Sequence, residues 1–235
     1  YLASETFDIP EDCSDEARQG ITQAELTIAI PLTTRLEKVF AYLPVWEEGT
    51  GLPFIINSDF ILSASRENMH VDRPWNLFLR DQIARVYTKA LLQGMNDTSL
   101  TIRQKLMLLQ SLPVNSGNSF LQPVISHIKA LLAEAQFIPT IKGTLARAAE
   151  ARIADADFYK LFCSDKKMPV QVAESENLVP GDLLELEDLL AKYGLERLED
   201  DRVVDILKDR EWLKSQNYQW FCDLFCWLSE LDLSA

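Results

Sequence analysis

The sequence predicts an α+β protein, in which a small, mainly antiparallel sheet with covering helices is followed by a mostly helical region. Three strand-like segments lie within residues 21–65 and no helical pattern separates them. After Pro74 the spacing of apolar residues changes to that of a helix. We therefore expect an acidic arm or linker over residues 1–20, a sheet plus a helix over 21–95, and a mostly helical region over 96–235.

Each expected strand has its own pattern. In residues 21–33 the apolar residues fall at every second position, which is typical of a half-buried strand. Residues 35–46, "RLEKVFAYLPVW", repeat this alternation. Residues 51–65, "GLPFIINSDFILSAS", are apolar on both faces for part of their length, which favours a central strand covered on two sides. Three strands in so short a stretch make a meander the simplest arrangement.

The first helix is predicted over residues 75–94, where apolar residues recur at helical spacing. Asp72 is the expected N-cap, Pro74 lies in the first turn and Gly94 ends the helix. Further helices are expected in residues 98–112, 119–135, 182–194 and 200–231, and a short strand pair near 137–146 with its turn at Lys142-Gly143.

Composition limits the classes of function. The chain carries 23 Lys and Arg against 36 Asp and Glu, a net charge of −13, which argues against nucleic acid as a partner. It has no run of eighteen apolar residues and no signal peptide, so we expect no membrane span. We interpret the four cysteines as free thiols of a reducing compartment, with the cytoplasm expected and the nucleus as an alternative.

Familiar catalytic motifs are missing from the sequence. It contains no GxxxxGK(S/T), GxGxxG, GxSxG or HExxH pattern and no paired CxxC. Cys222 and Cys226 have helical spacing but too few companions for a metal site, and His127 has either a packing or surface role or that of a ligand. We therefore do not expect the chain to be an enzyme in isolation, and we predict no metal site.

The candidate site lies in "INSDFILSASRENMHVDRPWN", residues 56–76, where a strand end leads into a polar turn. A sheet that fixes the start of a turn, with a helix that fixes its exit, is suited to aiming an arginine at phosphate oxygens. Arg66 is the candidate. The alternative is that Arg66 pairs with Glu67, Asp59 or Asp72 and only organises the turn.

The segments "VFAYLP", "GLPFIINSDFILSASRE" and "WN", within residues 24–92, resemble a signature of sacsin and its relatives, large proteins with an ATPase module of the GHKL type. Heat-shock chaperones of ninety kilodaltons are more distantly similar. The resemblance implies a chaperone middle-domain-like fold in which Arg66 contacts the γ-phosphate and Ser65, Glu67 and Asn68 support the loop. It also implies that ATP and Mg bind only through an N-terminal ATPase lobe that this chain does not contain. "FIPTIKGTLARAAEA" resembles a second phrase of the family, with Lys142 in place of its usual acidic residue.

The leading hypothesis is therefore a segment of a sacsin-like, chaperone-related ATPase, with the ATPase lobe of the same polypeptide and client proteins as partners. An inert interaction scaffold, which would bind partners through aromatic clusters around Trp212, Trp220 and Trp227, is the alternative. A hydrolase using His70 and Asp72, two residues apart on one strand face, is a weaker third hypothesis because no nucleophile motif accompanies them.

Overall fold

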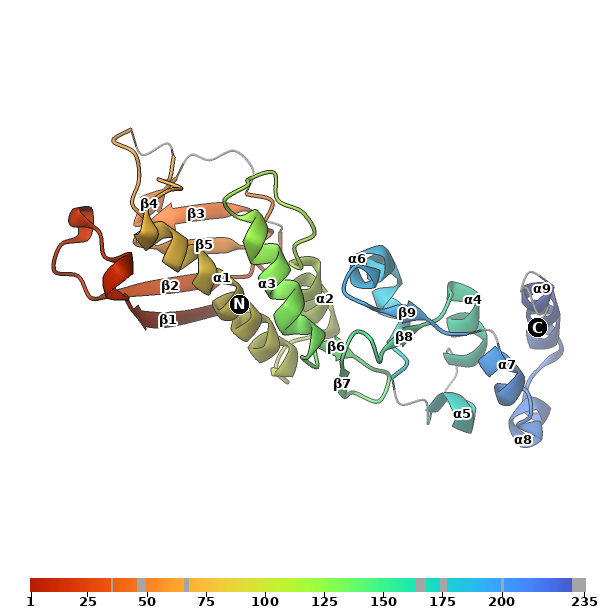
Figure 1. Ribbon diagram of the computed structural model, residues 1–235. Helices are drawn as coiled ribbons and strands as arrows, with labels where there is room; N and C mark the ends of the chain where they lie inside the picture. Colours follow the sequence, from red (N-terminus) through yellow and green to blue (C-terminus); the bar gives the residue numbers. More distant parts are fainter. Residues whose placement is uncertain are drawn as a thin grey trace. The chain divides into compact units, whose positions relative to one another are not determined.

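The computed structural model describes residues 1–235 except 35, 46–49, 66–67, 164–167, 174–176, 200 and 230–235. The chain divides into two compact units, Tyr1–Phe137 and Ile138–Ala235 (Figure 1). The first is a sheet with helices and the second is mainly helical, which confirms the α+β prediction. The boundary does not follow residue 95 as expected, because the two helices after the first one pack with it in the same unit.

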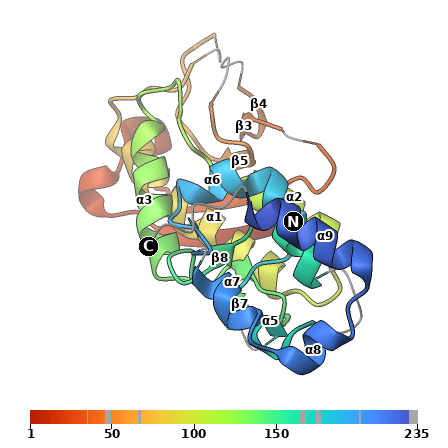
Figure 2. The ribbon, with the colours of Figure 1, turned by 90° about the vertical axis from the view of Figure 1, so that its right-hand side faces the viewer.

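Among the described residues the first unit contains a five-stranded sheet in the order β1-β2-β5-β3-β4 (Figure 1). Figure 2 shows the same ribbon turned by 90°, with β3, β4 and β5 labelled. The strands are β1 Leu2–Asp8, β2 Gln23–Ala29, β3 Lys38–Ala41, β4 Leu43–Pro44 and β5 Ile55–Ser58. Neighbouring strands are antiparallel except β3 and β5, which are parallel. The sheet is mainly antiparallel as predicted, but it is not a meander because β5 lies between β2 and β3.

Residues 1–20 differ from the expected arm or linker. Most of the first eight residues form β1, which pairs with β2 along its whole length. The two 3-10 turns Glu11–Cys13 and Glu16–Arg18 follow it. The inward-facing side chains of β1 include Ala3 and Phe7, which are buried. Because only these few side chains enter the core, the segment has no clear apolar alternation that would predict a strand. The prediction of an arm was therefore wrong for this segment.

The central position predicted for the third strand is confirmed by β5, which has β2 and β3 as its neighbours. Its alternate residues Ile56 and Ser58 are buried, and the Ser58 hydroxyl donates to the Glu25 carbonyl at 2.7 Å. Asn57, between them, is exposed, so the strand is not covered on both faces.

The first helix, α1 Pro74–Asn96, packs against β1 and β2. The predicted apolar stripe is confirmed, and its members are buried: Trp75, Leu79, Ile83, Val86, Tyr87, Ala90 and Leu91. The predicted cap was wrong, because Arg73 occupies the N-cap position and makes no side-chain capping bond. The helix also continues two residues beyond Gly94.

The helices α2 Ile102–Gln110 and α3 Gln122–Ala133 pack against α1. The side chain of Thr101 caps α2, which begins later than the helix predicted from residue 98. Between these helices the chain approaches Gly51, which has a φ of +68°. A Cβ at Gly51 would lie 2.6 Å from both the Asn115 carbonyl oxygen and the Ser116 Cα, so the approach requires glycine.

The second unit is made of short elements. Its strands pair as β6 Ile138–Pro139 with β7 Leu145–Ala146, which confirms the predicted pair near 137–146, and as β8 Arg152–Ile153 with β9 Glu196–Arg197. Its helical segments are α4 Ala156–Phe158, a π-helix Tyr159–Cys163, α5 Val170–Ala173, a 3-10 helix Gly181–Leu186, α6 Glu187–Ala191, α7 Asp201–Ile206, α8 Arg210–Lys214 and α9 Tyr218–Leu228. Across the described residues no helix has both the length and the apolar character needed to cross a bilayer.

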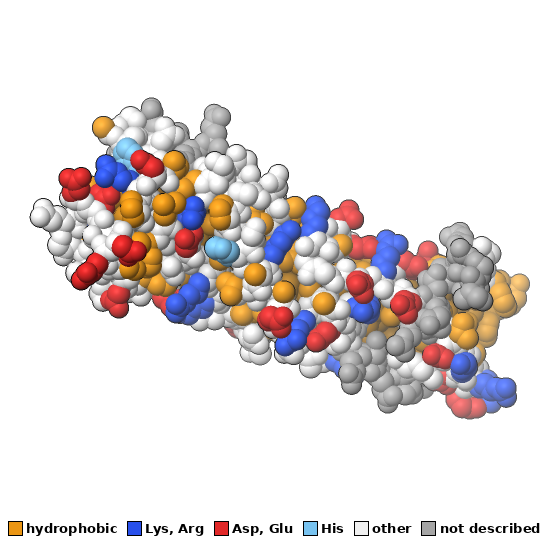
Figure 3. All heavy atoms as spheres, in the orientation of Figure 1, with side chains coloured by type: hydrophobic (Ala, Val, Ile, Leu, Met, Phe, Trp, Pro, Cys, Tyr) orange, Lys and Arg blue, Asp and Glu red, His pale blue; other side chains and the backbone are white. Residues whose placement is uncertain are grey.

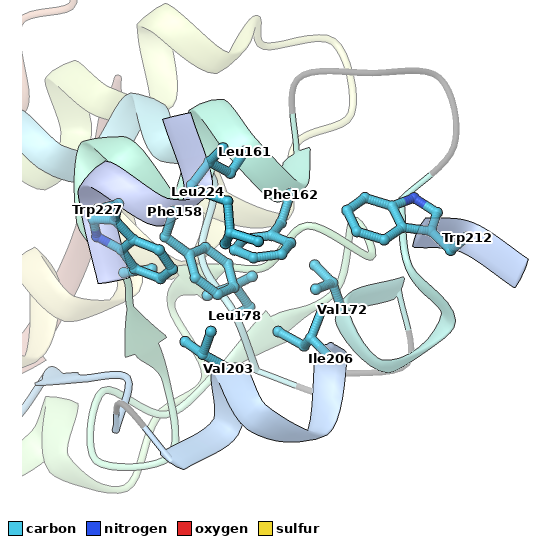
Figure 4. Close-up of a cluster of buried hydrophobic side chains, with 11 residues drawn as sticks. Phe158, Leu161, Phe162, Val172, Leu178, Val203, Ile206, Trp212, Leu224 and Trp227 are labelled. Atoms are coloured by element: carbon cyan, nitrogen blue, oxygen red, sulfur yellow. The ribbon is translucent and has the colours of Figure 1, made fainter. Parts of the chain in front are cut away.

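An aromatic cluster joins these short helices (Figure 4). Phe162, on the π-helix, lies at its centre, with its ring 4.9–6.0 Å from the rings of Phe158, Trp212, Trp220 and Trp227. The indole nitrogen of Trp220 donates to the Leu161 carbonyl at 2.9 Å. Elements of three to eleven residues gain little stability as isolated helices, so this shared core is what stabilises the unit.

Replacement of Phe162 with alanine is expected to lower the free energy of unfolding of the second unit by about 3–5 kcal/mol. The reason is that the cavity would open among four aromatic rings at once. Phe225→Ala on α9, where the native residue is 67% exposed, is the matched control, with a change of about 0.5 kcal/mol or less. Urea denaturation followed by tryptophan fluorescence measures both, and equal losses would contradict the central role of Phe162.

A pair of glycine substitutions tests the close approach at Gly51. Gly20 also has a positive φ, of +80°, but no atom lies within 4 Å of the position that a Cβ would occupy there. Gly20→Ala should therefore lower the free energy of unfolding by only about 1–2 kcal/mol, which is the cost of a positive φ for a residue with a Cβ. Gly51→Ala should cost about 1–3 kcal/mol more, since the backbone of residues 115–116 must move. Thermal denaturation of the two variants gives the difference, and equal melting temperatures would rule out the contact.

Candidate functional site

The candidate site is a short hairpin, Leu62–Met69, that follows the central strand β5 and precedes α1. Leu62 and Met69 form an antiparallel bridge. The Ser63 amide donates to the Asn68 carbonyl at 2.9 Å. Just outside the bridge, the His70 amide donates to the Ile61 carbonyl at 3.1 Å. The backbone thus closes the loop at its base, as a turn that is fixed at both ends requires.

The predicted site residues are distributed over this hairpin. Arg66 and Glu67 lie outside the described residues, so their predicted roles stay predictions. Ser65 and Asn68 flank them and both approach Ser63: the Ser65 and Ser63 hydroxyl oxygens are 3.2 Å apart, and the Asn68 amide is 3.4 Å from the Ser63 oxygen. Sequence reasoning missed Ser63, although its place at the foot of the turn was a usable signal.

The buried carboxamide of Asn76 connects both arms of the hairpin to the first turn of α1. Its Oδ1 accepts from the Ile61 amide, and its Nδ2 donates to the Ile61 and His70 carbonyls, all at 2.8 Å. Asn76 is fully buried. A buried polar group that loses its hydrogen-bond partner destabilises the fold. These three bonds therefore fix the positions of Ile61 and His70 relative to the first turn of α1.

A second set of contacts fixes the segment between β5 and the hairpin. The Trp75 indole nitrogen donates to the Asp59 carbonyl at 2.8 Å. Arg18, from the second 3-10 turn, donates to the Asp59 carboxylate at 2.6 Å and to the Phe60 carbonyl at 3.3 Å. Asp59, which the sequence offered as a candidate partner for Arg66, therefore has Arg18 as an ion-pair partner.

An open depression of about 630 Å³ lies beside the first arm of the hairpin. Its lining includes Arg18, Tyr42, Asp59 and Ser63. The Nε of Arg18 is buried and has no hydrogen-bond partner within the described part of the chain. Tyr42 has a φ of +63° and is 82% exposed, so an aromatic ring and a guanidinium share this surface. Such groups can contact a charged or planar ligand.

The other candidate residues do not assemble into a catalytic site. Residues 71–72 form a turn and not a strand, so the expected shared face of His70 and Asp72 is wrong. His127 is exposed on α3. Within the described ranges no three His, Cys, Asp or Glu side chains gather as a metal site would require. Burial raises the pKa of the Cys163 thiol to about 11, so it stays protonated and unreactive near neutral pH.

Acidic and basic side chains are interspersed on the face that Figure 3 shows. Apolar side chains lie between them, and histidine is also visible on this face. A broad basic surface of the kind that binds nucleic acid is not seen among the described residues of this face.

Part of the chain is similar in sequence to part of a known plant protein. The chain is 46% identical over 55 residues to Protein NO VEIN of Arabidopsis thaliana. That match covers 23% of this chain and 2% of the plant protein, so the similarity is to a small part of a much longer chain. No family model and no solved structure matches.

A double-mutant cycle on Arg18 and Asp59 is expected to give a coupling energy of about 1–2 kcal/mol, because both partners are largely withdrawn from water. Their side chains are 24% and 17% exposed. The pair Lys214–Glu211, 2.7 Å apart but 71% and 85% exposed, is the control and should couple by roughly 0.3–0.5 kcal/mol. Urea unfolding of the single and double alanine variants measures both cycles. A coupling at Arg18 and Asp59 no larger than the control would exclude the pair as an anchor of the site.

Proposed function

We propose that this chain is a segment of a sacsin-like, chaperone-related ATPase, and that its hairpin presents Arg66 to the γ-phosphate of ATP. The nucleotide and its Mg²⁺ are held by an ATPase lobe elsewhere in the same polypeptide. Arg66 supplies positive charge to the transferring phosphoryl group, and Ser65, Glu67 and Asn68 support the loop. The segment does not hydrolyse ATP by itself.

The observation that carries this proposal is the attachment of the hairpin. Its first arm continues from the central strand of the sheet, and both arms are hydrogen-bonded to Asn76. A charged group at the end of such a support loses little freedom when it meets a ligand, which is the condition for electrostatic stabilisation of a transition state. The sequence resemblance to sacsin relatives and the similarity to part of Protein NO VEIN support the same interpretation.

An interaction scaffold is the second candidate function, and the surface of α9 favours it. Tyr218 and Phe225 on this helix are 84% and 67% exposed. Trp212 and Trp227, which the sequence suggested as binding residues, are buried in the core of the second unit. The prediction that they form a contact surface was therefore wrong. A scaffold would instead bind client proteins through the exposed side of α9. Such a protein would show no change in the hairpin when ATP is added.

Replacement of Arg66 with alanine in the full-length protein is expected to lower ATP turnover by about 10³-fold or more, because no other charge replaces it at the γ-phosphate. Nucleotide affinity should change little, since the ATPase lobe supplies most of the binding contacts. Arg103→Ala, at an exposed position on α2, is the matched control and should leave turnover unchanged. Steady-state phosphate release and a nucleotide-binding titration measure the two effects. Normal turnover in the Arg66→Ala protein would exclude the ATPase role and favour the scaffold.

A further inference from the structure

We propose that Asn76 is a positioning residue, whose buried carboxamide sets the orientation of the hairpin Leu62–Met69 relative to α1. This inference rests on the proposed function, because it identifies what holds the arginine loop in its working position. The residue acts through the backbone of the hairpin arms and touches neither nucleotide nor phosphate.

The chemistry of the site requires an amide. Three backbone groups converge on Asn76: the Ile61 N–H, which needs an acceptor, the His70 C=O, which needs a donor, and the Ile61 C=O, which accepts from Asn76 in addition to the His70 amide. A carboxamide offers both kinds of group on one planar end. Aspartate keeps the acceptor but loses the donors and places its charge against two carbonyl oxygens. Glutamine adds a methylene group that would have to fit into a close-packed interior.

The bonds of Asn76 serve the hairpin and not the helix that carries it. All three hydrogen bonds go to residues outside α1, and none of them is a helix cap. They join residues 61 and 70, which stand on either side of the hairpin. A shift of the first turn of α1 would therefore move the backbone at Ile61 and at His70 together, and with it the base of the hairpin.

Another buried polar residue on α1 provides a matched control. Thr88 is 8% exposed, and its hydroxyl has no hydrogen-bond partner in the described part of the chain. Thr88→Val keeps the shape and removes only that hydroxyl. Thr88→Val should change neither the hydrogen exchange of residues 61–70 nor ATP turnover. The comparison separates a general effect on α1 from an effect through the hairpin.

Hydrogen exchange on the chain tests the mechanical step without any activity. Asn76→Asp should speed exchange of the peptide covering residues 61–70 by on the order of tenfold or more, because the variant loses both donated bonds and places a charge against the two carbonyls. Peptides from β2 should keep their protection. Unchanged exchange over 61–70 would overturn the proposal, and so would equal deprotection of the whole first unit. If Asn76→Asp does not fold, Asn76→Ser is used, which carries no charge and is too short to pair with all three backbone groups, and the same exchange results decide the outcome.

A double-mutant cycle with Arg66 in the full-length protein tests the functional step. If Asn76 acts through the loop, Asn76→Asp should lower ATP turnover by on the order of tenfold or more in the native background and by less than about twofold when Arg66 is already alanine. An equal factor in both backgrounds would show a general structural effect and overturn the positioning role. If Arg66→Ala itself leaves turnover unchanged, the ATPase proposal fails and the positioning role fails with it. If Arg66→Ala lowers turnover but Asn76→Asp leaves it unchanged, the ATPase proposal stands and the positioning role alone is wrong.

Discussion

The first unit depends on satisfying the polar groups that are buried where the sheet meets α1. Between Ser58 at the end of the central strand and Pro74 at the start of α1 the chain turns back on itself, and this path places the carbonyl of Ile61 in the interior and that of His70 in a partly buried position. Asn76 pairs with both, and Trp75 pairs with the carbonyl of Asp59. Without these partners the partly buried His70 and Asp59 carbonyls would lose their side-chain donors, so the side chains at the start of α1 and the path of the hairpin are determined together.

The two units are stabilised by different kinds of core. The first has a long helix on a sheet, and its core includes the stacked rings of Phe54 and Tyr87, 4.4 Å apart. The Tyr87 hydroxyl also lies 2.9 Å from that of Ser111, just after α2, which ties the second helix to the first. The second unit has no long element among its described residues and depends on aromatic contacts between short helices. Such contacts connect residues far apart in sequence, as Phe158 and Trp227 do.

Much of the fold could be predicted from periodicity, because the α1 stripe and the alternation in β2 are strong local signals. The strand β1 could not, since only Ala3 and Phe7 among its inward side chains mark it as core. The helix cap was misplaced because Asp72 has the preferred residue type, whereas Arg73 occupies the N-cap position without a side-chain bond and Pro74 begins the helix. At the site, the sequence indicated the loop and its arginine but not Ser63, Arg18 or Asn76. Ser63 is a local neighbour of the turn, but Arg18 reaches Phe60 across forty-two residues, and such a contact is visible only in three dimensions.

The π-helix Tyr159–Cys163 has a consequence for how the second unit can vary. Phe158, Leu161 and Phe162 stand three and four residues apart, which is the spacing that places side chains on one helical face, and all three are buried in the same core. A residue inserted or deleted between Phe158 and Phe162 would turn Phe162 by about 100° around the axis relative to Phe158. Phe162 would then point away from the other aromatic rings. Length is therefore constrained in this stretch as tightly as composition, and insertions or deletions between related chains should fall elsewhere in the unit.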